Sequence, residues 1–324
     1  MKVCIYGAGA IGGWIGSGLA HAGCSVSVVA RGATLDALQL HGLRLKQGAK
    51  VTSQAVASSA LPADLGVQDL VVLAVKAPSL PEVTQQIAPL LGPDTIVLTA
   101  MNGVPWWFLQ GFGGALAGTH LRSVDPDGEL AKAIPARHII GCVVHANCSQ
   151  EEPGLVHHHF GNTLILGEPS GEKTPRVRQL AALLEKAGFE APISGQIQKD
   201  IWFKLWGNMT VNPISALTGA TTDLIMADEL VRGFISQVML EAKEIGARIG
   251  IPIDQQPEDR HQITRKLGAV KTSMLQDVEA GKAVELDTLV AAVRELGQLT
   301  GVATPFTDAL LGLARLQARV HGLY

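Results

Sequence analysis

The first part of the chain alternates short apolar runs with segments whose apolar residues recur at helical spacing. The runs that are rich in β-branched residues and apolar on both faces span residues 2–6, 25–30, 70–75, 95–99 and 139–147. The segments with helical spacing between them span residues 10–22, 33–41 and 79–91. Strands that are apolar on both faces are typical of a sheet covered by helices on both sides. The pattern therefore predicts an α/β fold that begins with a Rossmann-type doubly wound sheet.

Two later runs, residues 155–159 and 164–168, predict a hairpin around Gly161-Asn162. After about residue 196 the β-branched runs stop and long helical patterns take over. These patterns cover residues 230–249, 288–300 and 305–320. The interpretation is a Rossmann-like NADP-binding domain over residues 1–195, followed by a C-terminal all-helical substrate or catalytic domain over residues 196–324.

Composition narrows the class of protein. The 324 residues are 47% apolar and 17% charged, which is typical of a compact globular chain of two domains. A net charge of −3 gives no basic surface for nucleic acid. Glycines interrupt the apolar residues 1–30, which could be mistaken for a signal peptide, and glycines and Pro105 interrupt residues 95–118, which are long enough to span a bilayer. The four cysteines form no C-x-x-C pair, which favours free thiols in a reducing cytosol. We expect a cytoplasmic protein without membrane or nucleic-acid partners.

A glycine-rich sequence follows the first predicted strand and opens the first predicted helix. It reads Gly7-Ala8-Gly9-Ala10-Ile11-Gly12, the G-x-G-x-x-G pattern of dinucleotide-binding turns. Gly7 would permit the tight turn, Gly9 the approach of a pyrophosphate, and Gly12 close packing of helix on strand. The N-terminus of the helix would face the negative charge. The alternative is a glycine-rich turn without a ligand.

Arg31 lies nineteen residues after Gly12, at the end of the second predicted strand. An NAD-specific fold usually carries an acidic residue there for the ribose hydroxyls. A guanidinium can instead pair with a 2′-phosphate, which a carboxylate would repel. The sequence therefore predicts that NADP(H) is preferred over NAD(H). An exposed arginine that binds no ligand is the alternative.

Further motifs follow in chain order. They are Val75-Lys76 at a strand end, Asn102-Gly103, the spaced series Lys204, Asn208 and Asn212, and Ser273 with Glu285. Together with the glycine motif and Arg31, they resemble the ketopantoate reductase (2-dehydropantoate 2-reductase) family over nearly the whole chain. The resemblance implies that the cofactor lies between a Rossmann domain and a helical domain. It also implies NADPH-dependent reduction of a 2-keto acid, characteristically ketopantoate to pantoate in pantothenate biosynthesis.

By match to the family motif, Lys204 is the implied general acid toward the keto oxygen. Hydride delivery to a ketone leaves negative charge on that oxygen, which an ammonium group both stabilises and protonates. Lys204, Asn208 and Asn212 are four residues apart, so they would share one face of a helix. A cation and two amides are costly to bury without a polar partner, which favours a polar substrate at this face. The alternative is that these three side chains line a hydrated groove on the protein surface and bind no ligand.

The resemblance also assigns contacts to four other residues. Glu285 is implied to help hold the substrate and the lysine, and Ser273 to bind the substrate carboxylate. Asn102 would contact substrate or nicotinamide, and Lys76 is taken as a charge on the cofactor side. The alternatives are an exposed helix residue for Glu285, a helix N-cap for Ser273 and a plain Asn-Gly turn at residue 102.

Two features have no place in this interpretation. Residues 106–153 are aromatic and glycine-rich, and they could form part of the substrate pocket or a packed surface loop. His157, His158 and His159 are consecutive, and because neighbours on a strand point to opposite faces, at most His157 and His159 could share a metal. We expect a hydrated sheet edge or a dimer contact there and no metal site.

Two other functions stay open. A related NADP-dependent dehydrogenase acting on another hydroxy acid or polyol would need the same cofactor fold and a lysine acid. A non-catalytic NADPH-binding sensor would not need the coherent set of Lys204, Asn208, Asn212 and Glu285. The apolar helices of the second half could cover an internal core or a second copy of the chain, so a homodimer is also open.

Overall fold

The computed structural model describes residues 1–324, which divide into two compact units. An α/β unit comprises residues 1–101 and 128–197, and a helical unit comprises residues 102–127 and 198–324. The contiguous division at residue 195 expected from the sequence differs, because residues 102–127 group with the helices. That segment carries no strand or helix pattern that would assign it to either unit. None of the helices is both long and apolar enough to cross a membrane.

A single sheet of nine strands forms the α/β unit, in the order β4-β3-β9-β8-β7-β6-β1-β2-β5. The strands are β1 (Lys2–Tyr6), β2 (Ser25–Val29), β3 (Leu43–Gln47), β4 (Lys50–Gln54), β5 (Ala57–Ser59), β6 (Gln68–Leu73), β7 (Leu91–Thr99), β8 (Ile139–Glu152) and β9 (Leu155–Gly167). From β5 to β8 all neighbours are parallel, in the order of a doubly wound dinucleotide fold. The predicted fold class is confirmed, and the antiparallel pairs β8–β9 and β3–β4 extend the sheet.

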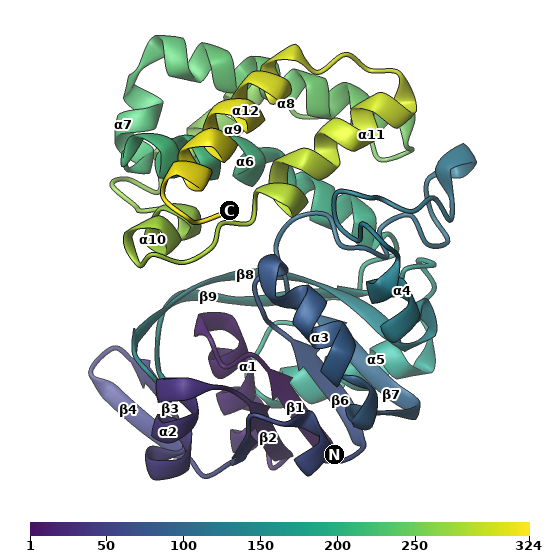
Figure 1. Ribbon diagram of the computed structural model, residues 1–324, viewed down its shortest axis with the longest axis vertical. Helices are drawn as coiled ribbons and strands as arrows, with labels where there is room; N and C mark the ends of the chain where they lie inside the picture. Colours follow the sequence, from purple (N-terminus) through teal and green to yellow (C-terminus); the bar gives the residue numbers. More distant parts are fainter. The chain divides into compact units, whose positions relative to one another are not determined.

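The extended end of the sheet curls around the first helix. The helices of this unit are α1 (Ala10–His21), α2 (Gly32–His41), α3 (Leu80–Gln86), α4 (Glu129–Ala133) and α5 (Pro175–Lys186). In Figure 1, β8 and β9 arch over α1. A Cβ at Gly13 would lie 2.6 Å from Val156 of β9, and one at Gly16 would lie 2.8 Å from Ile5 of β1. Because strands approach α1 on two sides, only very small residues fit there.

The predicted hairpin around Gly161-Asn162 is wrong. Residues 155–167 form the single strand β9, and the chain reverses before it, at Pro153-Gly154. Gly161 has a φ of +78° and lies opposite a register shift between β8 and β9, where a Cβ would be 2.6 Å from the carbonyl oxygen of His145. A glycine with positive φ serves a β-bulge as readily as a hairpin turn, which explains the error.

The helical unit is built around one long helix. Its elements are α6 (Ile197–Thr218), α7 (Thr222–Ala227), α8 (Glu229–Arg248), α9 (Pro257–Arg265), α10 (Ser273–Glu279), the π-helical segment η6 (Asp287–Ala291), α11 (Ala292–Thr300) and α12 (Pro305–Val320). Trp206 of α6 donates its indole N–H to the carbonyl of Met239 on α8 at 2.7 Å. A Cβ at Gly246 would lie 2.5 Å from the indole nitrogen of Trp202, so α6 and α8 pack closely.

Residues 102–127 belong to this unit through buried aromatic side chains and backbone hydrogen bonds. Trp107 and Phe108 are completely covered, and the Phe108 ring lies 6.1 Å from that of Trp202. The backbone N–H groups of Arg122 and Ser123 each donate to the Glu295 carboxylate at 2.8 Å. The aromatic part of residues 106–153 is therefore packed core of the helical unit, whereas residues 128–153 belong to the α/β unit.

Candidate active site

The glycine motif forms the turn between β1 and α1. Gly7 has a φ of +97°, and a Cβ there would lie 2.8 Å from a methyl group of Val75. A Cβ at Gly12 would lie 2.0 Å from the carbonyl oxygen of Gly7. Both positions therefore require glycine for the protein's own packing, Gly7 for the turn and Gly12 for the approach of α1 to it.

Gly9 has the opposite environment. A Cβ there would meet no atom within 4 Å, and its backbone is in an extended conformation that other residues adopt. Neither the packing nor the backbone of the protein therefore requires glycine at this position. Gly9 is the N-cap of α1, has no side chain to cap the first turn, and lines a cavity of about 310 Å³. The first N–H groups of α1 lack intrahelical partners, as at any helix start, so this end of the helix suits an anion.

The cavity contains part of the predicted cofactor set. Gly7, Ala8, Gly9 and Arg31 line it, whereas Ala10, Ile11, Gly12 and Lys76 do not. Its other polar side chains are Tyr6, Thr34, Ser79, Glu82, Gln86 and Gln150. Asn102, which we also expected near the cofactor, belongs to the helical unit.

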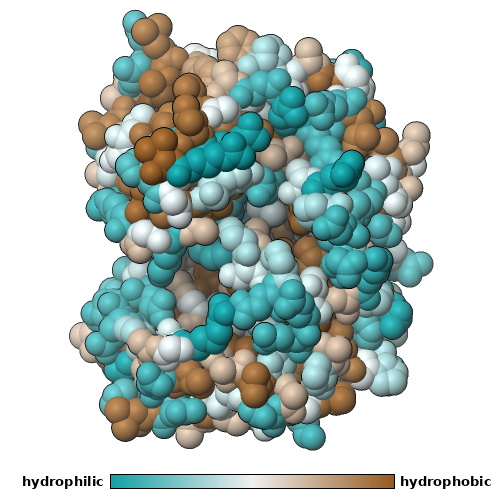
Figure 2. All heavy atoms as spheres, in the orientation of Figure 1, coloured by the Kyte–Doolittle hydropathy of each residue, from teal (hydrophilic) through white to brown (hydrophobic).

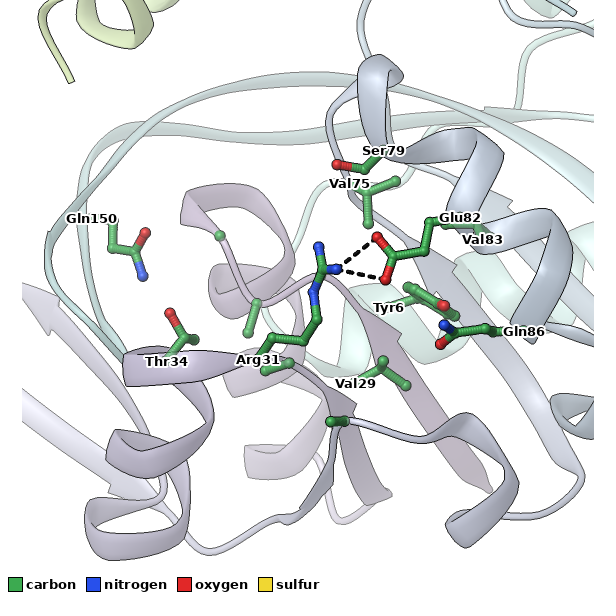
Figure 3. Close-up of a pocket in the computed structure, with 15 residues that line it drawn as sticks. Tyr6, Val29, Arg31, Thr34, Val75, Ser79, Glu82, Val83, Gln86 and Gln150 are labelled. Atoms are coloured by element: carbon green, nitrogen blue, oxygen red, sulfur yellow. Dashed lines mark hydrogen bonds and ion pairs between the residues drawn. The ribbon is translucent and has the colours of Figure 1, made fainter. Parts of the chain in front are cut away.

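Arg31 follows β2 as the N-cap residue of α2, and it pairs with a residue that the sequence analysis missed. Its Nη1 atom lies 2.5 and 2.6 Å from the two carboxylate oxygens of Glu82, in the first turn of α3 (Figure 3). The two residues are 51 positions apart in sequence, so no local pattern could have shown the pair. Burial raises the pKa of Tyr6 to about 12, with a further contribution from the negative charge of Glu82, so this phenol is a neutral hydrogen-bond donor at pH 7.

The helical unit brings two of the predicted site residues into contact. Lys204, half-buried on α6, donates a hydrogen bond from Nζ to Oδ1 of Asn102 at 2.9 Å. Gly103 has a φ of +81°, and a Cβ there would lie 2.6 Å from Thr288. The N–H of Val104 donates to the Thr288 carbonyl at 2.8 Å. This loop is therefore fixed to the start of η6, and its asparagine holds the lysine.

The remaining predicted residues are placed as follows. Glu285 is 6% exposed and precedes η6, so the alternative of an exposed helix residue is wrong. Asn212 is 7% exposed and Asn208 half-buried, and neither side chain has a hydrogen-bond partner in the protein. Ser273 is exposed at the first position of α10, where Thr272 is the N-cap and accepts from the N–H of Leu275. The N-cap role considered for Ser273 therefore belongs to its neighbour.

The three consecutive histidines lie on β9 and alternate in direction. His158 stacks on Trp14 of α1 with ring centroids 5.3 Å apart. His157 and His159 share the other face, where His157 contacts Glu151 at 2.8 Å and His159 contacts Ser149 at 2.8 Å. No group of three or more His, Cys, Asp or Glu residues in the chain is arranged to hold a metal ion.

Comparison with known proteins places this geometry in a family. The family model described as "Ketopantoate reductase PanE/ApbA" matches residues 3–171, and the model of its C-terminal part matches residues 196–318. A protein of Mesorhizobium japonicum named 2-dehydropantoate 2-reductase is 47% identical over 100% of both chains. A solved structure from Ralstonia solanacearum MolK2 is 54% identical, covers 99% of both chains and superposes with a TM-score of 0.94.

A more distant structure supports the same assignment. The 2-dehydropantoate 2-reductase of Geobacter metallireducens GS-15 is 26% identical, with a TM-score of 0.86 and coverage of 98% of this chain and 100% of that one. The two family models match the two halves of the chain in the order expected for the family, and the relatives match over their full length. These matches include the glycine turn and the helix that carries Lys204. The chain belongs to the ketopantoate reductase PanE/ApbA family of NADPH-dependent oxidoreductases.

Proposed function

We propose that this protein reduces a 2-keto acid with NADPH, and that ketopantoate is its substrate and pantoate its product. The observation that carries the proposal is the Lys204 ammonium group, half-buried and held at 2.9 Å by Asn102. Full-length similarity to a protein named 2-dehydropantoate 2-reductase supports the choice of substrate.

The residues around the cavity of the α/β unit fit a phosphorylated dinucleotide. Gly9 leaves open space beside the N-terminus of α1, which suits the pyrophosphate. Arg31 lines the same cavity and offers a guanidinium to a 2′-phosphate. When bound, NADPH supplies the hydride that reduces the keto carbon.

Lys204 supplies the proton in this proposal. As the keto carbon gains a hydride, its oxygen takes up the negative charge, and the Nζ proton passes to that oxygen. The neutral amine left behind is reprotonated from solvent. Asn102 accepts a hydrogen bond from Nζ, which restrains the rotation of a flexible side chain and keeps the ammonium group in one place.

The other residues hold the substrate. Asn208 and Asn212 lie one and two turns along α6 from Lys204, and their amides are available to a polar ligand. Glu285 would accept a hydrogen bond from a substrate hydroxyl, and Ser273 would donate one to the substrate carboxylate. A 2-keto acid with a hydroxyl group, such as ketopantoate, offers a partner to each of these groups.

The decisive experiment follows the loss of reduced-nicotinamide absorbance with ketopantoate and a panel of other 2-keto acids. We expect turnover with ketopantoate and its loss in Lys204→Ala, with binding of NADPH retained. Faster turnover of another panel member would identify a related dehydrogenase with a different substrate. Tight NADPH binding by the wild type without oxidation by any member would support the sensor function instead.

The proposal extends to the setting in which the protein works. Four free cysteines fit a reducing cytoplasm, and burial raises the pKa of the Cys4 thiol to about 12, so it is unreactive.

The last helix carries an exposed apolar stripe. On α12, Leu313, Leu316 and Val320 are between 57% and 74% exposed, which favours a homodimer. Light scattering during gel filtration would measure the mass.

A further inference from the structure

The cavity of the α/β unit contains two opposite charges and no others. Arg31 and Glu82 are the only charged residues that line it, and they pair with each other (Figure 3). Glu82 comes from α3, whose neighbouring side chains Leu80 and Val83 are buried, so the backbone of Glu82 is held in place. The site predicted to bind a 2′-phosphate through Arg31 thus also contains a carboxylate on a backbone that is held in place.

The two cofactors differ where these charges lie. NADPH carries a 2′-phosphate with a charge of about −1.5 to −2 at pH 7, whereas NADH carries a hydroxyl there. Glu82 occupies Nη1 of Arg31, so a phosphate either displaces it from that nitrogen or binds another nitrogen of the same guanidinium, and in both cases it lies near the carboxylate. A ribose hydroxyl can donate a hydrogen bond to a carboxylate, as it does in NAD-specific folds.

The ion pair of Arg31 and Glu82 is exposed to solvent, so a bound phosphate can separate the two side chains. The Arg31 side chain is 64% exposed and that of Glu82 is 39% exposed. Ion pairs in such surroundings contribute little to stability, because water and salt screen them. The carboxylate therefore weakens phosphate binding without preventing it.

We propose that Glu82 sets how strongly this enzyme prefers NADPH over NADH. It competes with the 2′-phosphate for Arg31, repels that phosphate, and accepts a hydrogen bond from an unphosphorylated ribose. The preference for NADPH is then smaller than Arg31 alone would make it. This inference rests on the cofactor site proposed above and adds a residue from α3 that determines its specificity.

The test measures binding by calorimetry on the full chain, with no substrate present. Four probes are used: NADPH, NADH, adenosine 2′,5′-bisphosphate and adenosine 5′-monophosphate. In Glu82→Gln, which removes the charge and keeps the shape, we expect NADPH and the bisphosphate to bind about three-fold to ten-fold tighter. NADH and the monophosphate should bind equally well or more weakly.

The matched control is Glu129→Gln. Glu129 also lies in the first turn of a short helix, α4, and pairs with Lys132 at 2.7 Å, but it does not line the cavity. We expect no change in any dissociation constant. An unchanged ratio of NADH to NADPH dissociation constants in Glu82→Gln, weaker NADPH binding, or an equal shift in Glu129→Gln would overturn the inference.

Failure of the underlying proposals would look different. A wild-type protein that binds neither dinucleotide would refute the cofactor site and the role of Glu82 with it. Dinucleotide binding that shifts as expected, in a protein that reduces no 2-keto acid, would refute the proposed reaction and support the role of Glu82.

Discussion

Lys204 donates a hydrogen bond to the side chain of Asn102, a residue 102 positions earlier in the chain. Lys204 lies on α6, and Asn102 lies in the loop that follows β7. The loop is in turn fixed by Gly103 and Val104 to Thr288, three residues after Glu285. One short loop thus connects the lysine helix to the segment that carries the buried carboxylate.

Removing the Asn102 acceptor should affect turnover more than binding. We expect Asn102→Ala to lower kcat by about ten-fold to a hundred-fold, because a misplaced general acid costs rate even when the chemistry is intact. KM for the keto acid should change less. Steady-state kinetics with ketopantoate measures both, and Asn102→Asp, which keeps an oxygen acceptor at the same place, should retain more activity. Equal losses in the two variants would contradict a positioning role.

Two glycines of the same motif should respond differently to alanine. Gly9→Ala should leave the thermal unfolding temperature nearly unchanged, because the new methyl group meets no protein atom, yet it should weaken NADPH binding by filling the space beside the helix N-terminus. Gly12→Ala should lower the unfolding temperature, because its Cβ would lie 2.0 Å from the Gly7 carbonyl oxygen. Differential scanning calorimetry and NADPH titration separate the two effects, and a stable Gly12→Ala protein would contradict this geometry.

Arg176 of α5 neutralises a buried carboxylate. Glu168 is 3% exposed and accepts hydrogen bonds from Nε and Nη2 of Arg176, at 2.7 and 2.5 Å. Arg176→Ala should lower the free energy of unfolding by about 2–4 kcal/mol, because it leaves a buried charge without its cation. Denaturation in urea measures the change. Arg178→Ala, on an exposed position of the same helix, is the control and should cost little; a similar loss there would contradict the explanation.

His261 should make the protein less stable in acid. It is 2% exposed, contacts the Ser236 hydroxyl at 2.8 Å, and has its pKa lowered, chiefly by burial. The unfolded chain therefore takes up this proton at a higher pH than the native state does. The contribution of the neutral His261 ring to the free energy of unfolding is present above about pH 6.5 and is lost as the pH falls. For one proton, the free energy of unfolding falls by at most about 1.4 kcal/mol per pH unit.

The measurement is the free energy of unfolding between pH 7 and 5. His261→Gln should show a shallower decline than the wild type, since glutamine takes up no proton. His41→Gln, at an exposed position of α2, should follow the wild-type curve. If the free energy of unfolding of His261→Gln fell with pH as steeply as that of the wild type, burial of this ring would not contribute to the loss of stability in acid.

The features that could be predicted from the sequence are those that depend on neighbours along the chain. The strand, glycine turn and helix at residues 2–21 are confirmed because each is specified by periodicity and by backbone positions that only glycine fits. The helices at α8 and α12 follow from apolar spacing in the same way. Gly161 was misassigned because a positive φ alone does not distinguish a bulge from a hairpin turn.

The way in which distant segments meet could be seen only in the folded chain. The strands β3 and β4 join the sheet beside β9, and residues 102–127 pack with helices that begin about a hundred residues later. The contacts of Arg31 with Glu82 and of Lys204 with Asn102 join residues separated by 51 and 102 positions. Such pairs depend on how packed elements close in space, and burial and packing are properties of the folded chain that local spacing does not encode.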